Sequence, residues 1–462
     1  MKKKIIGFCL AIVMVAMATT ALVGCGKKSE KALDIVYLKA GRGETYVNKL
    51  VDEYKKDNPN IKITVKGFPS TTIKDELNNL VNSGNTPDLV FFNLGGDGAV
   101  IERYIKDKAL VDLSDVVTSK IPGEELTVGD KLIDGILNNY NCQPYGGGKT
   151  YLMPAFYSPT GLFYDASRFT GDNAEFDLPT TMEEFFALGD KLKQEDKGVH
   201  LFTYPTAGYF DGYIYSLLGG YLSDEKFNQV LSYADGIWED AEVKNALTQV
   251  VKLKDYLNPN TVGQANSESF TKNQQSVIGS ADGKTKGSSL FMPNGDWLPR
   301  EMSKTTPEGF QWGFMPVPKK DAQSKAAVNT FIETMVVMKE GDMVDEAKNF
   351  IKFYYSDKAA KIIATESKAI IPTKQALANA KTNGIDDFTI SLYDAYDGNK
   401  AVVGTFVATK PVADVVWANI LFNEQINVMM KNEQKQSIEQ ITNDWCAKLE
   451  SASDKLRANI TK

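Results

Sequence analysis

The stretch that decides the fold is residues 34–92, which contains three short apolar segments: DIVYL at 34–38, IKITV at 61–65 and DLVFF at 88–92. Between them, apolar residues recur every three or four positions at 47–54 and 73–81. The short segments are typical of strands, and the two longer ones of amphipathic helices. Strands that alternate with helices in this way predict a mainly parallel sheet with helices on both sides, hence an α/β fold.

Further elements are expected along the rest of the chain. Strands are predicted at 161–164 and 331–338, and helices at 245–257, 346–355, 413–430 and 437–449. Another helix opens at Thr181, because the acidic residues that follow it suit a helix N-terminus. Ligands of open α/β sheets bind beyond the carboxyl ends of the strands. The loops of interest are therefore 41–44, 93–97, 154–160 and 294–297.

Residues 1–24 have the composition of an export signal. Three lysines at 2–4 precede an uncharged apolar run, which ends in LVGC at 22–25. This end resembles a bacterial lipobox, in which the chain is cut before the cysteine and its sulfur is lipidated. We expect a lipid anchor at Cys25, a tether over 25–32, and a protein on the extracellular face of the cell membrane. Retention by lipid favours a cell with one membrane, a Gram-positive bacterium.

Two alternatives to a lipoprotein remain, an uncleaved membrane anchor and an ordinary secreted protein. The anchor is disfavoured by length, because a spanning helix needs about 20 apolar residues. Cleavage leaves 438 of the 462 residues, which is too long for one core and predicts two lobes. It also removes three lysines, so the formal charge changes from −7 to −10. An acidic chain repels nucleic acid and anionic lipid, which favours a neutral or cationic partner.

The sequence contains little that binds a metal or a cofactor. The only histidine is His200, in an apolar context that predicts a structural role, and there is no CxxC motif. These two facts exclude a zinc site rich in histidine and cysteine. A calcium site built from oxygen ligands stays open, and no cofactor is expected. Cys142 and Cys446 are either one disulfide or two buried thiols. Residues 146–150 lack the spacing of a phosphate-binding loop and predict a surface hairpin.

No catalytic motif stands out, so we expect a protein that is not an enzyme. The nucleophile motif GxSxG is absent, although 59 acidic residues leave a glycosidase-type carboxylate pair open.

Aromatic and polar residues gather in the segments 153–159, 209–211 and 294–297. Sugars present apolar C–H faces and a rim of hydroxyls, so their sites need flat aromatic side chains beside Asp, Asn and Arg. These segments therefore favour a carbohydrate site. We expect Trp297 in that site, and Trp238 and Trp445 in the core.

Six segments, in their order and spacing, resemble the extracellular solute-binding proteins of ABC sugar importers, of the maltose-binding type. They are 86–92, 151–165, 179–185, 291–297, 313–318 and 347–357. Residues 292–302 also look like the subgroup that binds N-acetylglucosamine and its short oligomers. The sequence departs from the maltose type at 93–97, where an acidic contact is displaced, which argues against maltose itself.

The resemblance implies a periplasmic-binding-protein-like fold of type II, with two α/β lobes that close on a ligand as a hinge. The first lobe would comprise 33–160 plus about 333–390, and the second 161–332 plus about 391–462. We expect a monomer that captures a mono- or oligosaccharide and delivers it to ABC permease subunits. The rival interpretations are a cell-surface glycoside hydrolase and a binding protein for a non-sugar solute coupled to a receptor.

Carried over position by position, the resemblance implies two groups of ligand-binding residues. The stacking aromatics would be Tyr157, Tyr209, Phe210, Trp297 and Trp417, and for Trp417 a place in a helix core is the alternative. The polar contacts would be Arg42, Asn93, Asp97, Asp211, Asn294 and Asp296.

Overall fold

The computed structural model describes residues 31–39, 42–69, 71–94, 100–172, 174–205, 209–264 and 270–461. Cys25, the export signal and Asp97 lie outside these residues. The side chain of Asn93 also lies outside what the structure describes.

Nine strands of the described residues form one sheet in the order β2-β1-β3-β8-β4-β6-β5, with β7 paired to β4 and β9 to β8. They are β1 (Leu33–Lys39), β2 (Ile63–Pro69), β3 (Leu89–Asn93), β4 (Leu152–Asp165), β5 (His200–Phe202), β6 (Ser289–Gly295), β7 (Trp312–Met315), β8 (Ala327–Val337) and β9 (Lys400–Val402). Strands β1, β2 and β3 are parallel, as residues 34–92 predict. The sheet as a whole is mixed. Strands β4 and β8 run antiparallel to each other, β4 is also antiparallel to β6, and β8 is antiparallel to β3.

Helices cover both faces of the sheet in the first lobe. They are α2 (Thr45–Asp57), α3 (Ile73–Asn82), α4 (Val100–Lys106), α5 (Ser114–Thr118), α6 (Val128–Lys131), α14 (Val344–Tyr354) and α15 (Asp357–Ser367). Side chains alternate along β1, so successive residues enter different cores. Ile35 and Tyr37 pack with α2, α14 and α15, whereas Val36 packs with α3 and α4.

The second lobe is built mainly of helices around β5 and β6. They are α7 (Met182–Glu195), α8 (Phe210–Tyr221), α9 (Asp224–Leu231), α10 (Ala241–Lys252), α11 (Thr261–Gln264), α12 (Phe270–Ile278), α13 (Leu298–Glu301), α18 (Trp417–Leu421), α19 (Asn423–Lys431) and α20 (Ile438–Arg457). Thr181 caps α7 in a capping box with Glu184, as predicted. Trp238 and Trp445 are fully buried in the core of this lobe, which confirms their predicted place.

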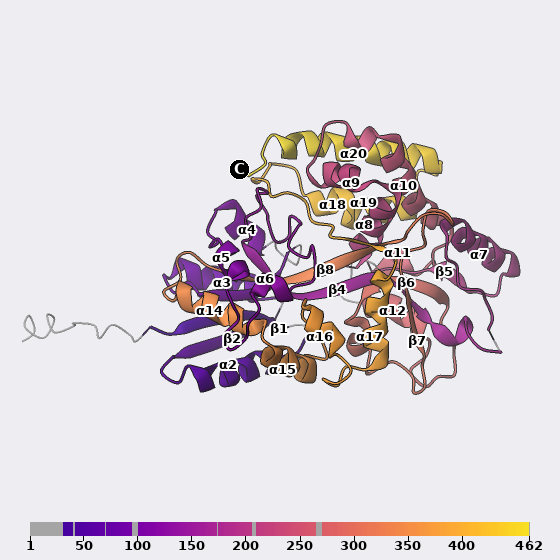
Figure 1. Cartoon of the computed structure of the whole chain (residues 1–462). Coiled ribbons are helices and arrows are strands. Elements are labelled where there is room, and N and C mark those ends of the chain that lie inside the picture. Colours follow the sequence, from indigo (N-terminus) through magenta and orange to yellow (C-terminus); the bar gives the residue numbers. More distant parts are fainter. Residues whose placement is uncertain are drawn as a thin grey trace, which may run out of the picture.

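Strands β4 and β8 pass side by side from one lobe to the other (Figure 1). Every residue of β4 is buried, because the strand lies in the middle of the sheet over its whole length. Helices α16 (Lys374–Ala378) and α17 (Asp387–Tyr393) follow α15, and α17 contacts β4 and β7. The predicted lobe boundaries at 160, 332 and about 390 fall inside β4, β8 and α17. The two-lobed α/β fold is confirmed.

The helix predicted at 413–430 is two helices. It starts late, because Asp414 has a left-handed backbone (φ +62°), and it is interrupted at Phe422 (φ −126°, ψ −70°) between α18 and α19. The indole N–H of Trp445 donates to the carbonyl of Ile420 (2.9 Å). This carbonyl lies next to the break, and the bond gives it a hydrogen-bond partner. Helix α20 runs further than the predicted 437–449 and ends at Arg457.

Cys142 and Cys446 are both free and buried, so the structure contains the pair of thiols and not the disulfide. Among the described residues, no helix combines the length and apolar character needed to cross a membrane.

Candidate ligand-binding site

The two crossing strands present a mixed polar and aromatic face where the lobes meet. Side chains two residues apart on a strand point the same way, and so do the partners directly opposite them. Three register pairs share this face: Phe156 with Glu333, Ser158 with Phe331, and Thr160 with Asn329. We call these six residues the hinge face.

A β-bulge in β4 sets the direction of the hinge face. The register with β8 shifts between Pro154 and Phe156, so Ala155 is the extra residue. Two tyrosine hydroxyls hold the bulge: that of Tyr354 donates to the carbonyl of Ala155 (3.0 Å), and that of Tyr355 to the carbonyl of Pro154 (2.7 Å). The end of α14 therefore fixes which β4 side chains point toward Arg42.

Arg42 follows β1 and lies buried against the hinge face. Its guanidinium donates to both carboxylate oxygens of Asp296 (3.1 and 3.2 Å), to Glu333 through Nε (2.8 Å) and to the hydroxyl of Ser158 (2.7 Å). It also lies 4.9 Å from the centre of the Phe156 ring. Burial alone would lower the pKa of Arg42, but the charges of Asp296 and Glu333 outweigh burial and raise it, so the guanidinium stays charged.

The loop after β6 carries Asp296 and Trp297. Gly295 has no side chain, and a Cβ there would lie 2.3 Å from the Trp297 ring, so glycine lets the indole fold back over its own loop. The half-buried Trp297 ring meets Tyr209 and Phe331 edge to face, with ring centres 6.1 and 5.4 Å apart. We call Tyr209, Trp297 and Phe331 the aromatic group.

Tyr209 and Asp211 come from the start of α8. The hydroxyl of Tyr209 donates to Glu301 (3.0 Å), and the amide of Gln274 donates to the other oxygen of the same carboxylate (2.7 Å). Asp211 is half-buried, accepts from the backbone N–H of Gly212 (2.8 Å), and burial raises the pKa of its carboxyl. A Cβ on Gly212 would lie 2.5 Å from the Thr160 hydroxyl, so the first turn of α8 sits directly on the hinge face.

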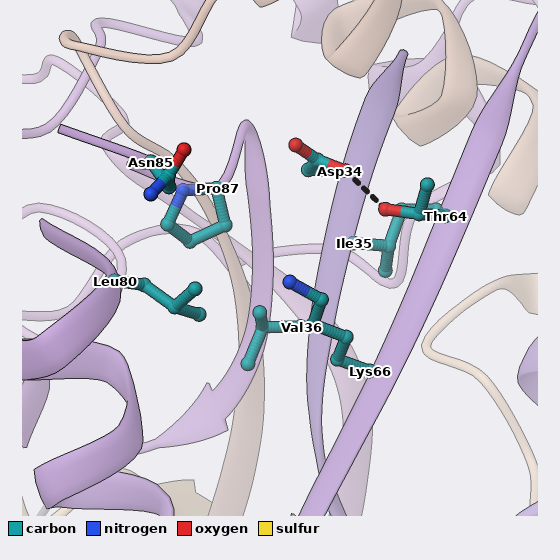
Figure 2. Close-up of a pocket in the computed structure, with 8 residues that line it drawn as sticks. All are labelled: Asp34, Ile35, Val36, Thr64, Lys66, Leu80, Asn85 and Pro87. Atoms are coloured by element: carbon teal, nitrogen blue, oxygen red, sulfur yellow. Dashed lines mark hydrogen bonds between the residues drawn. The ribbon is translucent and has the colours of Figure 1, made fainter. Parts of the chain in front are cut away.

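Two surface cavities lie elsewhere. The first, of about 300 Å³, is lined by Asp34, Ile35, Val36, Thr64, Lys66, Leu80, Asn85 and Pro87 (Figure 2). It opens near the starts of β1 and β2, whereas Arg42 follows the end of β1. The second, of about 500 Å³, lies between α18, α19 and α20. Neither contains a residue of the hinge face.

Among the residues that the structure describes, one group of carboxylates could hold a cation. Asp235, Glu450 and Asp454 lie close together in the second lobe. Arg457 already pairs with Asp235 (2.7 Å), Asp454 and Glu450 (3.9 Å), and Glu450 accepts backbone N–H groups at Gly236 and Trp238. The arginine supplies the positive charge that an ion would otherwise bring.

The family model for bacterial extracellular solute-binding proteins matches residues 40–361, which is most of the chain. This chain belongs to that family. Many solved structures share the fold of this solute-binding protein, and a search of curated proteins by sequence found no match.

Three solved structures illustrate the shared fold. An ABC substrate-binding protein from Listeria monocytogenes, in complex with cycloalternan, is 18% identical and covers 92% of this chain and 99% of its own, with a TM-score of 0.61. The sugar-binding protein MalE of Xanthomonas citri is 16% identical over 93% and 98%, with a TM-score of 0.64. Maltose-binding MalE of L. monocytogenes, in complex with maltose, is 16% identical over 94% and 100%, also with a TM-score of 0.64.

The structure of this solute-binding protein brings five of the predicted ligand residues to the junction of the lobes. They are Arg42, Tyr209, Asp211, Asp296 and Trp297. Asn294 lies in the same loop but is 1% exposed; its side-chain oxygen accepts from the N–H of Gly295 (2.9 Å), and its amide nitrogen has no partner among the described residues. Asn93 ends β3 opposite Glu333 by backbone register.

Three predicted aromatics lie elsewhere. Tyr157 points to the opposite side of β4 from Ser158, where its buried ring packs on Tyr393 and Tyr396. Phe210 is fully buried in the core of the second lobe, 4.8 Å from Tyr204 between ring centres. Trp417 packs on Phe406, Tyr233 and Trp238. This packing agrees with the alternative interpretation of Trp417, a place in a helix core. We therefore leave these three out of the proposed ligand set.

Sequence reasoning named none of the six hinge-face residues as ligand residues. Four of them contact Arg42 or Trp297: Phe156, Ser158, Phe331 and Glu333. A signal for the last two was present, because residues 331 and 333 are two apart in a predicted strand and must share a face. The contact of Glu333 with Arg42 joins residues 291 apart, and that of Phe331 with Trp297 joins two different elements, β8 and the loop after β6.

Proposed function

We propose that this solute-binding protein captures a mono- or oligosaccharide where its lobes meet and delivers it to an ABC permease, held at the cell surface by lipid on Cys25. The observation that carries the proposal is the aromatic group beside Glu333, which shares a strand face with Phe331, together with Asp211 in the first turn of α8, two residues after Tyr209. Aromatic rings stack on the C–H faces of a sugar, and carboxylates accept hydrogen bonds from its hydroxyls. The names of the structural neighbours, which mention cycloalternan and maltose, support the same ligand class.

The proposed mechanism is differential binding between an open and a closed form. Tyr209 and Trp297 belong to the second lobe, whereas Glu333 pairs with β3 of the first lobe. A ligand that touches both sets makes all its contacts only when the lobes are closed, so it shifts the population toward the closed form. The permease would then recognise that form. No bond of the ligand is made or broken in this mechanism.

The test is a thermal-shift screen of the purified protein over a panel of neutral sugars, amino sugars and oligosaccharides. A true ligand present at 100 times its Kd stabilises the folded state by about 2.7 kcal/mol, which gives a clear rise in Tm. We expect at least one sugar to respond, followed by titration calorimetry for its Kd. Peptides and polyamines are screened in the same way, and a response only to them would exclude the sugar proposal.

The same sugars, incubated with the protein and separated by chromatography, test the glycoside hydrolase alternative. We expect oligosaccharides to be recovered intact. Cleavage products that disappear when Asp211 or Glu333 is replaced by its amide would contradict the binding-only mechanism.

A further inference from the structure

Two arginines cross between the lobes in opposite directions. Arg42, which follows β1 of the first lobe, reaches Asp296, which follows β6 of the second lobe. Arg300, on α13 of the second lobe, donates to the backbone carbonyl of Ser367 (2.9 Å) at the end of α15. Helix α15 packs on α2, so Ser367 belongs to the first lobe. The apolar side chains of Leu298 in α13 and of Met302 just after it join the same buried cluster as α15. Both arginine contacts join protein atoms directly.

The contact between Arg42 and Asp296 is made in a dry place and with favourable geometry. The exposed fractions of the two side chains are 10% and 1%. Two parallel N–H···O bonds form, one from each terminal nitrogen, which is the strongest arrangement that an arginine and a carboxylate adopt. The low local dielectric strengthens this pair and protects it from salt.

Arg42 is also held in position by residues outside the loop that carries Asp296. Nε donates to Glu333, which pairs with β3, and a terminal nitrogen donates to Ser158 on β4. The Phe156 ring lies beneath the guanidinium. Because these contacts do not involve Asp296, we expect them to orient the guanidinium in the open form as well. Closure therefore loses less side-chain entropy than pairing two free side chains would.

We propose that Arg42 and Asp296 form an interlobe latch, which Arg300 and the Ser367 carbonyl reinforce, and that this latch holds part of the population closed through protein contacts alone. Four of the five guanidinium N–H groups of Arg42 are used by protein acceptors. Arg42 therefore acts on the lobes rather than as a principal donor to the ligand, which changes the role that the sequence resemblance implies for it. The proposal does not depend on which solute binds.

Small-angle X-ray scattering of the purified protein without added solute tests the latch, because opening raises the radius of gyration. Asp296→Asn keeps the shape of the side chain and removes its charge. We expect the ratio of open to closed protein to rise at least about tenfold, since hydrogen bonds to charged groups are at the strong end for proteins.

Glu175→Gln is the matched control. It makes the same change at a partner of another buried arginine, Arg168, which lies with Glu175 inside the second lobe (2.9 Å). It should lower Tm without changing the radius of gyration. An equal change of shape in both variants would mean that loosening of the fold, and not the latch, is being measured.

Arg300→Ala provides a second test if Asp296→Asn does not fold, because Arg300 is exposed. It should also raise the open fraction, and the double variant should raise it further. Scattering curves of Asp296→Asn and Arg300→Ala that superimpose on that of the unmodified protein would refute the latch. That result would leave the proposed sugar binding untouched, because the measurement uses no sugar.

Discussion

At the scale of single residues, the site depends on side chains whose roles follow from what they touch. Trp297 is half-buried and meets Tyr209 and Phe331 edge to face, so one indole face is supported by protein. The Asp211 carboxylate accepts hydrogen bonds from the backbone N–H of Gly212 and from its own backbone N–H, and its described contacts include no basic group. Both features suit a contact with an uncharged, hydroxyl-rich ligand.

Replacing Trp297 by alanine should weaken sugar binding by at least about 1 kcal/mol, roughly fivefold in Kd, because a stacking surface is lost. Titration calorimetry with the sugar found by thermal shift measures the change. Trp312→Ala is the matched control, because Trp312 is also half-buried but packs on Phe163 and Phe310. Unchanged affinity in Trp297→Ala would place this residue outside the site.

Asp211→Asn should stabilise the protein at neutral pH while weakening ligand binding. Burial raises the pKa of the Asp211 carboxyl above its value in the unfolded chain, so stability falls as the pH rises from the unfolded-state pKa through the folded-state pKa and stays lower above it. The amide removes that loss, and the difference in Tm from the unmodified protein should shrink as the pH falls through the pKa. Thermal unfolding measured from pH 3 to pH 8 checks the sign. A lower Tm for Asp211→Asn at neutral pH would contradict it.

Cys25→Ala should release the protein from membranes, because no lipid can then be attached. Fractionation of cells that express the variant, with blotting of membrane and medium, measures the release. Retention in the membrane fraction would mean that residues 1–24 remain as an anchor.

Cys142 and Cys446 should resist a thiol reagent in the folded protein at pH 8. Burial raises the pKa of each thiol to about 12, so almost none of the reactive thiolate is present. Ellman's reagent should show two reactive thiols only after unfolding. Reaction of both thiols in the folded protein, before any denaturant is added, would contradict the burial of these side chains.

At the scale of elements, the strand period decides which side chains reach the site. Tyr157 and Ser158 are neighbours in β4, and because side chains alternate, only one of them can face Arg42. The bulge at Ala155 determines which one. Strand β4 is buried along its whole length, so its sequence does not alternate between polar and apolar residues. Whether Tyr157 or Ser158 faces Arg42 therefore cannot be inferred from the sequence.

Tyr355→Phe tests the role of the bulge. It removes the hydroxyl that donates to the carbonyl of Pro154 and leaves that buried acceptor without this partner, at a cost of about 1–3 kcal/mol in the free energy of unfolding. Urea unfolding measures the loss. Tyr151→Phe is a control at a half-buried tyrosine of the first lobe, and we expect a smaller effect there. Equal losses in the free energy of unfolding of the two variants would contradict a special role for the bulge.

At the scale of the whole molecule, β4 and β8 form the joint about which the lobes would move. A bound sugar should lower the radius of gyration of the unmodified protein, because it favours the closed form. Scattering with and without the sugar measures this. Asp296→Asn should show a larger decrease, since it starts from a more open population. A sugar that binds tightly without any change in scattering would contradict closure.

The sequence by itself determined the α/β class, the parallel start of the sheet, the positions of some of the longer helices, the buried place of Trp238 and Trp445, and the family. These follow from local periodicity, caps and motif order, which are encoded within short stretches. Only the tertiary structure decided the direction of Tyr157, the core position of Phe210, and the meeting of Arg42, Asp296 and Glu333. These depend on a bulge and on pairings between residues up to 291 apart, and such pairings arise from packing that no local pattern contains.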